Sequence, residues 1–230
     1  MENGVWRTIR GRRVFIAEGE SPIDAFKKVL KKPKDNVLIE TASDYQDFIK
    51  NNKLINNDGT INKEVALLGT NPDRISNRTG NCQKCVPTYL ERLRGNDVIA
   101  NPLSGPNDKA YNDWYKLYKG VNSIKDWTQT SRSSGIRQIT NDIKAAGDGA
   151  VFEIYIAYNQ KSGQSGAHVF AGRNEKGKVI FENPQAVSSK FAFNRIDYIT
   201  DKSIWGETIY LRIDDKELKD EYKNEIYRKR

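Results

Sequence analysis

The chain has two cysteines, Cys82 and Cys85, which stand three positions apart after the polar turn Thr79-Gly80-Asn81. Apolar residues at helical spacing follow them: Val86, Tyr89, Leu90 and Leu93. This pattern predicts a helix that begins near Cys82 and ends before Gly95. A thiol in the first turn of a helix can be a nucleophile, because unpaired amides and the helix dipole favour the thiolate. We therefore expect Cys82 to be exposed, with a pKa below the free value of roughly 8.5.

Pro87 leaves the start of this helix open, because a proline is comfortable only in about the first turn. If the helix begins near Lys84, Cys85 takes the N-terminal position and is the alternative nucleophile. With the earlier start, Cys85 faces the core on the same side as Tyr89. The spacing alone also fits two small buried residues or half of a metal site. A zinc site is not expected, because the chain has no second CxxC pair and a single histidine.

That single histidine is His168, and an isolated histidine is more often structural than catalytic. Its position favours chemistry, because it lies in a predicted strand after the flexible segment at residues 162–166. The next predicted strand ends in Phe181-Glu182-Asn183-Pro184-Gln185. Neighbouring antiparallel strands can bring an amide or a carboxylate beside an imidazole and fix its tautomer. Together with a cysteine, this arrangement is typical of nucleophilic catalysis.

The elements that must position these residues are helices in the first part of the chain and strands in the second. Helical patterns occur at residues 43–51, after Thr60, from Cys82, at 111–118 and at 136–146. Strand patterns occur at residues 151–158, 167–171, 178–181 and 208–213. This order predicts an α+β fold in which the cysteine helix packs on an antiparallel sheet.

The two ends of the chain differ from its middle. Residues 5–16 predict a β-hairpin, and Ser21-Pro22-Ile23-Asp24 predicts the start of a helix. We therefore expect a small module at residues 1–35, a main domain at 36–213, and a charged helix or tail at 214–230. A hydrophobic content of 37% and an aromatic content of 10% are enough for one sizeable core.

Several segments of the main domain resemble a known family, the glutamine-deamidase-like papain-fold toxin domain of bacterial polymorphic toxins and phage minor head or head-morphogenesis proteins. The resemblance covers residues from about 70 to about 213. The segments that carry it are residues 81–100, Ala167-His168-Val169-Phe170, Phe181-Glu182-Asn183-Pro184-Gln185 and Asn194-Arg195-Ile196-Asp197. It implies a papain-like fold, with the cysteine on a central helix.

The resemblance also implies roles for individual residues. Cys82 is the expected nucleophile, His168 the general base and acid, and Asn183 the group that orients the imidazole. Side chains that could bind the oxyanion or support the site are Asn81, Asn77 and Gln185.

The chain departs from the family pattern at three positions. Ala167 stands where the family usually has glycine, Asn183 where it has aspartate, and Pro87 is an addition. Asparagine is chemically tolerable at that place, because papain-like proteases use an asparagine to orient their histidine.

The implied activity is hydrolysis of an amide bond without a cofactor, by a protein glutamine deamidase-type toxin or effector or by a peptidase of phage or mobile-element origin. The expected partners are a protein substrate and either a cognate immunity protein or phage capsid and portal proteins. Two other functions stay open: a catalytically silent phage head-associated protein, and a basic nucleic-acid-associated protein. The net charge of +8 favours contact with nucleic acid. We expect this contact to be weak, because Lys and Arg are spread along the chain rather than clustered.

The expected location follows from what the sequence lacks. It has no basic-then-apolar leader and no long apolar run, and its two cysteines cannot form a disulfide framework. We expect no signal peptide, no membrane contact, and a place in the cytoplasm of a bacterial host or in a phage virion.

Overall fold

The computed structural model describes residues 4–9, 12–19, 41–72, 80–130, 135–159, 165–186 and 208–230. The chain divides into two compact units, Met1–Val37 and Leu38–Arg230. In the first unit, β1 (Gly4–Ile9) and β2 (Arg12–Ala17) pair as the antiparallel hairpin that the sequence predicts. The helix predicted from Ser21 and the family-like stretch at 194–197 lie outside the described residues.

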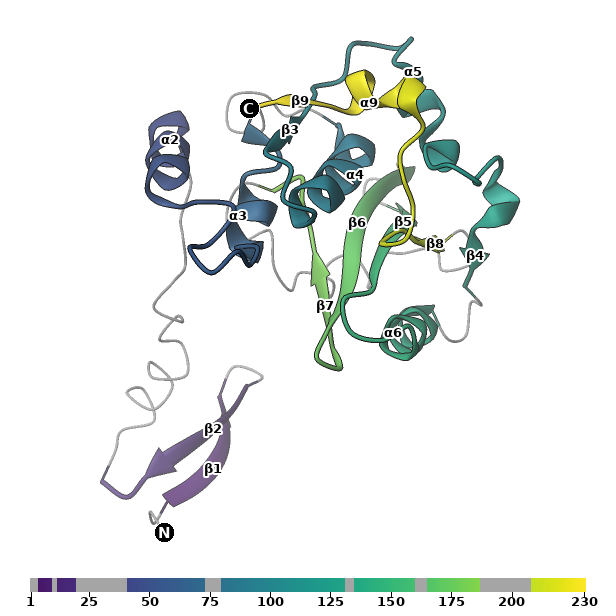
Figure 1. The fold of residues 1–230 in the computed structure, drawn as a ribbon. Coiled ribbons are helices and arrows are strands. Elements are labelled where there is room, and N and C mark those ends of the chain that lie inside the picture. Colours follow the sequence, from purple (N-terminus) through teal and green to yellow (C-terminus); the bar gives the residue numbers. More distant parts are fainter. Residues whose placement is uncertain are drawn as a thin grey trace. The chain divides into compact units, whose positions relative to one another are not determined.

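The second unit is built on a five-stranded antiparallel sheet with the strand order β4-β8-β5-β6-β7 (Figure 1). Its strands are β4 (Thr128–Gln129), β5 (Val151–Asn159), β6 (Ser165–Glu175), β7 (Lys178–Glu182) and β8 (Ile209–Arg212). The pairing of β5 with β6 runs from Val151↔Arg173 to Asn159↔Ser165. The predicted strands in the second half of the chain are therefore confirmed.

Four helices of this unit lie in the segments where the sequence shows helical spacing. They are α2 (Ala42–Asn51), α3 (Lys63–Leu68), α4 (Cys82–Leu93) and α6 (Gly135–Ala145). Thr41 caps α2 in a capping box with Asp44. Asn62, rather than the predicted Thr60, caps α3, because its side chain accepts a hydrogen bond from the amide of Val65.

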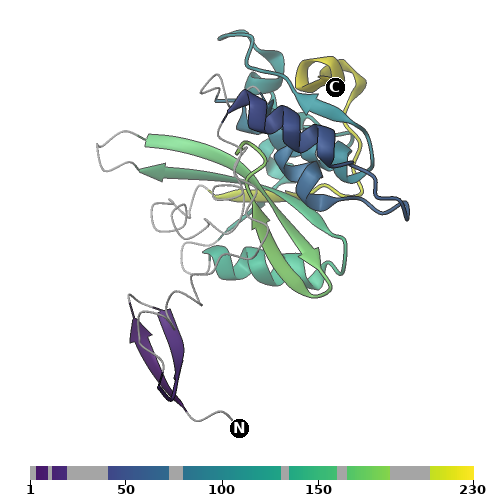
Figure 2. The same cartoon turned by 90° about the vertical axis from the view of Figure 1, so that its left-hand side faces the viewer.

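The α4 and α6 helices cover opposite faces of the sheet, as Figure 2 shows. Ile139 and Ile143 of α6 pack with Ile154 and Phe170, which are paired across β5 and β6. On the other face, the Tyr89 hydroxyl of α4 donates to Glu182, the partner of Ala171. Because side chains alternate along β6, Phe170 and Ala171 point to opposite faces. The structure therefore confirms the α+β fold, with the cysteine helix packed on the sheet.

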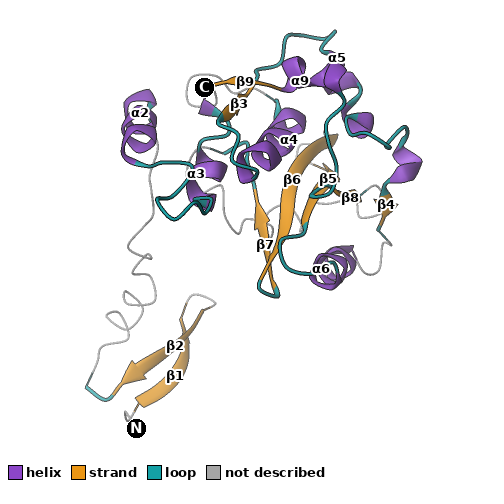
Figure 3. Cartoon of the chain, viewed as in Figure 1, coloured by secondary structure: helices purple, strands orange, loops and turns teal. Residues whose placement is uncertain are grey.

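The region predicted as one helix at 111–118 forms two short pieces instead (Figure 3), so that prediction is wrong. They are α5 (Lys109–Asn112) and the 3-10 helix η2 (Trp114–Lys116). The Trp114 ring stacks on Tyr155 of β5, with ring centroids 4.5 Å apart, and Trp127 meets it edge-on at 5.3 Å. Aromatic contacts with the sheet outweigh continuation of the helix here.

The charged C-terminal segment is part of the second unit. It contains α9 (Asp220–Ile226) and β9 (Tyr227–Lys229), and β9 pairs with β3 (Val98–Ala100) directly after α4. Its apolar residues Leu218, Tyr222 and Ile226 are buried. In the described part of the chain, the helices are too short or too polar to span a bilayer.

Candidate active site

The α4 helix begins at Cys82, with Asn81 as its N-cap residue. The earlier of the two predicted starts is therefore the observed one, and Pro87 lies inside the helix. Cys85 is fully buried, as is Tyr89. Cys82 is only 6% exposed, so the predicted exposure of its thiol is wrong.

Burial raises the pKa of the Cys82 thiol to about 11, and the buried carboxyl of Glu153 acts in the same direction. The backbone amides of Val169, Gln83 and Cys82 itself lower that pKa, because they donate toward the sulfur. The helix N-terminus therefore favours the thiolate as predicted, but the loss of water outweighs it. The net effect is a protonated thiol at neutral pH.

The sulfur of Cys82 lies at the place where β7 leaves the sheet. The Asn174 amide donates toward β5, to the carbonyl of Ala150. Because amides alternate along an antiparallel strand, the amide of Val169 points the other way, toward the β7 side. Pairing with β7 ends at Ala171↔Glu182, so β7 offers no partner for the amide of Val169. The sulfur of Cys82 accepts from that amide instead. The thiol therefore meets the residue that directly follows His168.

His168 and Asn183 are in direct contact. His168 Nε2 lies 3.2 Å from Asn183 Oδ1, and the amide of Gln185 donates to the same oxygen at 3.3 Å. An amide oxygen only accepts, so a neutral imidazole carries its hydrogen on Nε2 and its lone pair on Nδ1. The half-buried ring of His168 also lies parallel to Phe170, with centroids 6.4 Å apart. The imidazole is thus held in the tautomer whose Nδ1 can take a proton.

The side chains of Asn81 and Gln185 are committed to each other and to their surroundings. Asn81 Nδ2 donates to Asn71 Oδ1 at 3.1 Å and to the carbonyl of Asn101 at 3.0 Å. Gln185 Nε2 lies 3.5 Å from Asn81 Oδ1. These contacts favour a supporting role for both residues over that of an oxyanion donor. Asn77 lies outside the described residues.

The backbone of the first turn of α4 offers the nearest donors for an oxyanion. The Asn81 side chain does not cap the helix, and the Asn81 carbonyl accepts the amides of Lys84 and Cys85. The amides of Cys82 and Gln83 are left facing the sulfur. Backbone amides in such a turn are suited to bind the negative oxygen of a tetrahedral intermediate.

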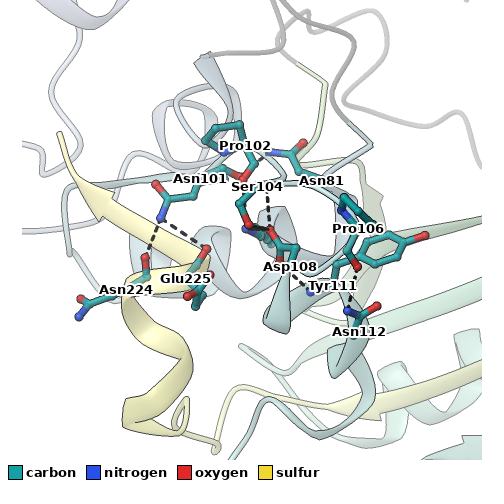
Figure 4. Close-up of polar contacts among 12 residues, drawn as sticks. Asn81, Asn101, Pro102, Ser104, Pro106, Asp108, Tyr111, Asn112, Asn224 and Glu225 are labelled. Atoms are coloured by element: carbon teal, nitrogen blue, oxygen red, sulfur yellow. Dashed lines mark hydrogen bonds and ion pairs between the residues drawn. The ribbon is translucent and has the colours of Figure 1, made fainter.

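A buried ion pair holds the first turn of α4 in place. Lys84 is 1% exposed, and its Nζ contacts Asp108 at 2.5 Å and the carbonyl of Pro102 at 3.0 Å. Asp108 also accepts from the amides of Ser104 and Tyr111, each at 2.9 Å (Figure 4). A lysine on the buried face of an amphipathic helix was the available sequence signal for this pair.

Glu153 is a second buried group that motif spacing does not identify. It is fully buried in β5, and the Tyr118 hydroxyl donates to its Oε2 at 2.5 Å. Burial raises the pKa of Glu153 to about 8, despite the hydrogen bond from Tyr118. The signal in the sequence is a lone acid inside the apolar run Val151-Phe152-Glu153-Ile154.

The described residues contain no cluster of His, Cys, Asp and Glu side chains that could hold a metal ion. A cavity of about 880 Å³ lies at the C-terminal end of α4, where Arg94, Asp97, Asp214 and Tyr227 line it. The first α4 residue that lines this cavity is Glu91, nine residues after Cys82, so the cavity lies roughly 13 Å along the helix from Cys82. Its lining has charges of both signs and does not reach the thiol.

Part of the chain matches a known protein family. Residues 80–187 match the model of the family described as papain fold toxin 1, glutamine deamidase. No curated protein and no solved structure matches the chain significantly. The matched segment contains Cys82, His168 and Asn183, and it spans α4 and the strands β5 to β7. This segment, a little under half of the chain, is therefore similar to papain-fold toxin domains of the glutamine deamidase type.

Proposed function

We propose that this domain is a cysteine amidohydrolase that converts glutamine side chains of a target protein into glutamate. In this proposal Cys82 is the nucleophile, His168 the general base and acid, and Asn183 the group that orients the imidazole. The observation that carries it is the 3.2 Å contact between His168 Nε2 and Asn183 Oδ1, together with the position of Cys82 at the start of α4, where the amide of Val169 donates toward its sulfur. The family match supports the same reaction class.

The reaction follows from these groups in two steps. The Cys82 sulfur attacks the carboxamide carbon while His168 Nδ1 takes the thiol proton, and the amides of Cys82 and Gln83 bind the oxyanion. The imidazolium then gives its proton to the leaving nitrogen, so that ammonia departs and a thioester forms. Water, activated by His168, hydrolyses the thioester to glutamate and restores the thiol.

The raised pKa of Cys82 decides how the nucleophile forms. With a thiol pKa of about 11, the resting enzyme holds a neutral cysteine rather than a preformed thiolate. His168 must then remove the proton as the sulfur attacks, which makes it a general base in the first step. Activity should therefore need the neutral form of His168 and should fall at acid pH.

Hydrolysis of carbobenzoxy-Gln-Gly tests this reaction, because its side-chain amide and its peptide bond report different activities. A deamidase releases ammonia, whereas a peptidase releases glycine. We expect ammonia from the native chain and from Cys85→Ala, and none from Cys82→Ala or His168→Ala. Release of glycine alone would show a peptidase, and ammonia from Cys82→Ala would contradict the assigned nucleophile.

One observation favours a second candidate, a catalytically silent protein associated with phage heads. A thiol that is 6% exposed and has a raised pKa also suits a buried structural cysteine. Such a protein would keep its fold in Cys82→Ala and would release neither product from the dipeptide. A target protein and a cognate immunity protein are the partners that the first candidate requires.

A further inference from the structure

Asn71 is a fully buried asparagine that follows α3 and has no part in the chemistry described above. Its Nδ2 donates to Asn81 Oδ1 at 3.2 Å and to the carbonyl of Gln185 at 3.1 Å. Its Oδ1 accepts from Asn81 Nδ2 at 3.1 Å. Asn71 thus joins the N-cap residue of α4 to the turn after β7 through three hydrogen bonds.

The orientation of these amides is fixed by backbone carbonyls. A carbonyl oxygen can only accept, so the atom of Asn71 that faces the Gln185 carbonyl must be nitrogen. The same reasoning holds for Asn81 Nδ2, which faces the carbonyl of Asn101. With both nitrogens assigned, the reciprocal bonds between Asn71 and Asn81 are the consistent arrangement.

Each side of this link leads directly to a reacting group. On one side, Asn81 precedes Cys82, and its carbonyl accepts the first amides of α4. On the other side, the Gln185 amide donates to Asn183 Oδ1, which contacts His168 Nε2. A movement of the turn after β7 relative to α4 would therefore shift Asn183, and the His168 ring that it contacts, relative to Cys82.

We propose that Asn71 is a positioning residue that sets the placement of the His168 imidazole relative to the Cys82 thiol. The inference rests on the proposed function for its catalytic consequence and on the hydrogen bonds of Asn71 for its geometry. A misplacement of about 1 Å between reacting groups can cost on the order of a hundredfold in rate. Loss of Asn71 should therefore reduce turnover more than substrate binding.

The test compares Asn71→Leu with a matched control, Asn101→Leu. Asn101 is also an asparagine beside the start of α4, but its Nδ2 donates to the carbonyls of Asn224 and Glu225 in α9 (Figure 4). The control thus removes amide contacts of the same kind without touching the turn that carries Asn183. Both variants are made in the full chain and measured by hydrolysis of carbobenzoxy-Gln-Gly and by nitrogen NMR of His168, the only histidine.

We expect Asn71→Leu to lower kcat roughly tenfold to a hundredfold while KM changes less than about twofold. The NMR signals should show a smaller share of the Nε2-protonated tautomer of His168. Asn101→Leu should leave kcat and the tautomer unchanged. If Asn71→Leu does not fold, Asn71→Ser, which leaves room for a water molecule, gives the same comparison.

Equal effects of the two variants on kcat and on the tautomer would overturn the proposal, and so would an unchanged tautomer in Asn71→Leu. The two claims fail separately. If the native chain hydrolyses nothing but the tautomer still depends on Asn71, the proposed function fails and the positioning role stands. If all variants hydrolyse the dipeptide at the native rate, the positioning role fails and the function stands.

Discussion

The groups that we propose to react have different surroundings. Cys82 is buried, and burial raises the pKa of its thiol by more than the surrounding backbone amides lower it. His168 is half-buried, and Asn183 holds the Nε2 side of its ring. The imidazole is therefore oriented for proton transfer, whereas the thiol depends on that transfer to become a nucleophile.

Glu153 should make the stability of the domain depend on pH. Its pKa rises from 4.5 to about 8 on folding, so the native state holds a proton that the unfolded state releases in this range. The free energy of unfolding is therefore highest below pH 4.5 and falls as the pH rises to about 8. The total loss is on the order of 3 to 5 kcal/mol. In Glu153→Gln this loss should disappear, because an amide side chain does not titrate in this range. The amide oxygen can still accept the hydrogen bond from Tyr118.

Urea unfolding at pH 5 and at pH 8 measures this effect. The control is Glu217→Gln, which removes an exposed carboxylate and should leave the pH dependence of the native chain in place. The assigned burial of Glu153 is contradicted if Glu153→Gln and the native chain lose the same stability between the two pH values.

At the scale of elements, Arg92 connects α4 to α3 and β3. Its fully buried guanidinium donates to the carbonyls of Ala66, Val65 and Val98 at 2.8 to 3.0 Å. The same group pairs with Asp97 at 2.9 Å. Arg92 therefore adds a charged donor to carbonyls near the end of α3, which also accept from the amide of Gly69 and the hydroxyl of Thr70.

We expect Arg92→Met to lower the free energy of unfolding by about 3 to 5 kcal/mol, because three buried carbonyls each lose a hydrogen bond from a charged donor. The matched control is Arg212→Met, since Arg212 is exposed and forms an ion pair with Asp214. That change should cost less than about 1 kcal/mol. Denaturant titration measures both, and similar losses in the two variants would contradict the role given to Arg92.

The elements that the sequence predicts well are those with a strong local signal. Apolar runs identify β5 to β8, and helical spacing before Gly95 identifies α4. The region at 111–118 has the spacing of a helix, yet Trp114 stacks on Tyr155, which no local pattern announces. Contacts between residues that are distant in the sequence decide the secondary structure of such segments.

The same distinction applies to the candidate site. The spacing of Phe181-Glu182-Asn183 after His168 predicts two neighbouring strands. The pairing of β6 with β7 ends at Ala171↔Glu182, one residue before Asn183, whose side chain reaches His168 beyond the paired residues. The burial of Cys82 could not be predicted, because it depends on where β7 leaves the sheet. Asn71 gives no signal either, since its partners Asn81 and Gln185 are defined only by the fold.

Removal of the two ends of the chain should have different effects on the free energy of unfolding. Residues 1–37 form a unit of their own, whereas the C-terminal segment contributes Leu218, Tyr222 and Ile226 to the core of the second unit. Deletion of residues 1–37 should change the free energy of unfolding of the remainder by less than about 0.5 kcal/mol. Deletion of residues 215–230 should cost several kcal/mol, at about 1.5 to 3 kcal/mol for each large apolar side chain.

Thermal or urea unfolding of the two truncated chains makes this comparison directly. A large loss of stability after removal of residues 1–37 would show that the two units depend on each other.

In the proposed function, Cys82 is a nucleophile that His168 activates toward glutamine. The most direct test of this role is labelling with a diazoketone analogue of glutamine, followed by peptide mass spectrometry to locate the adduct. We expect an adduct on Cys82 in the native chain and in Cys85→Ala, and no adduct in His168→Ala. An adduct on Cys85, or labelling of Cys82 that does not need His168, would contradict it.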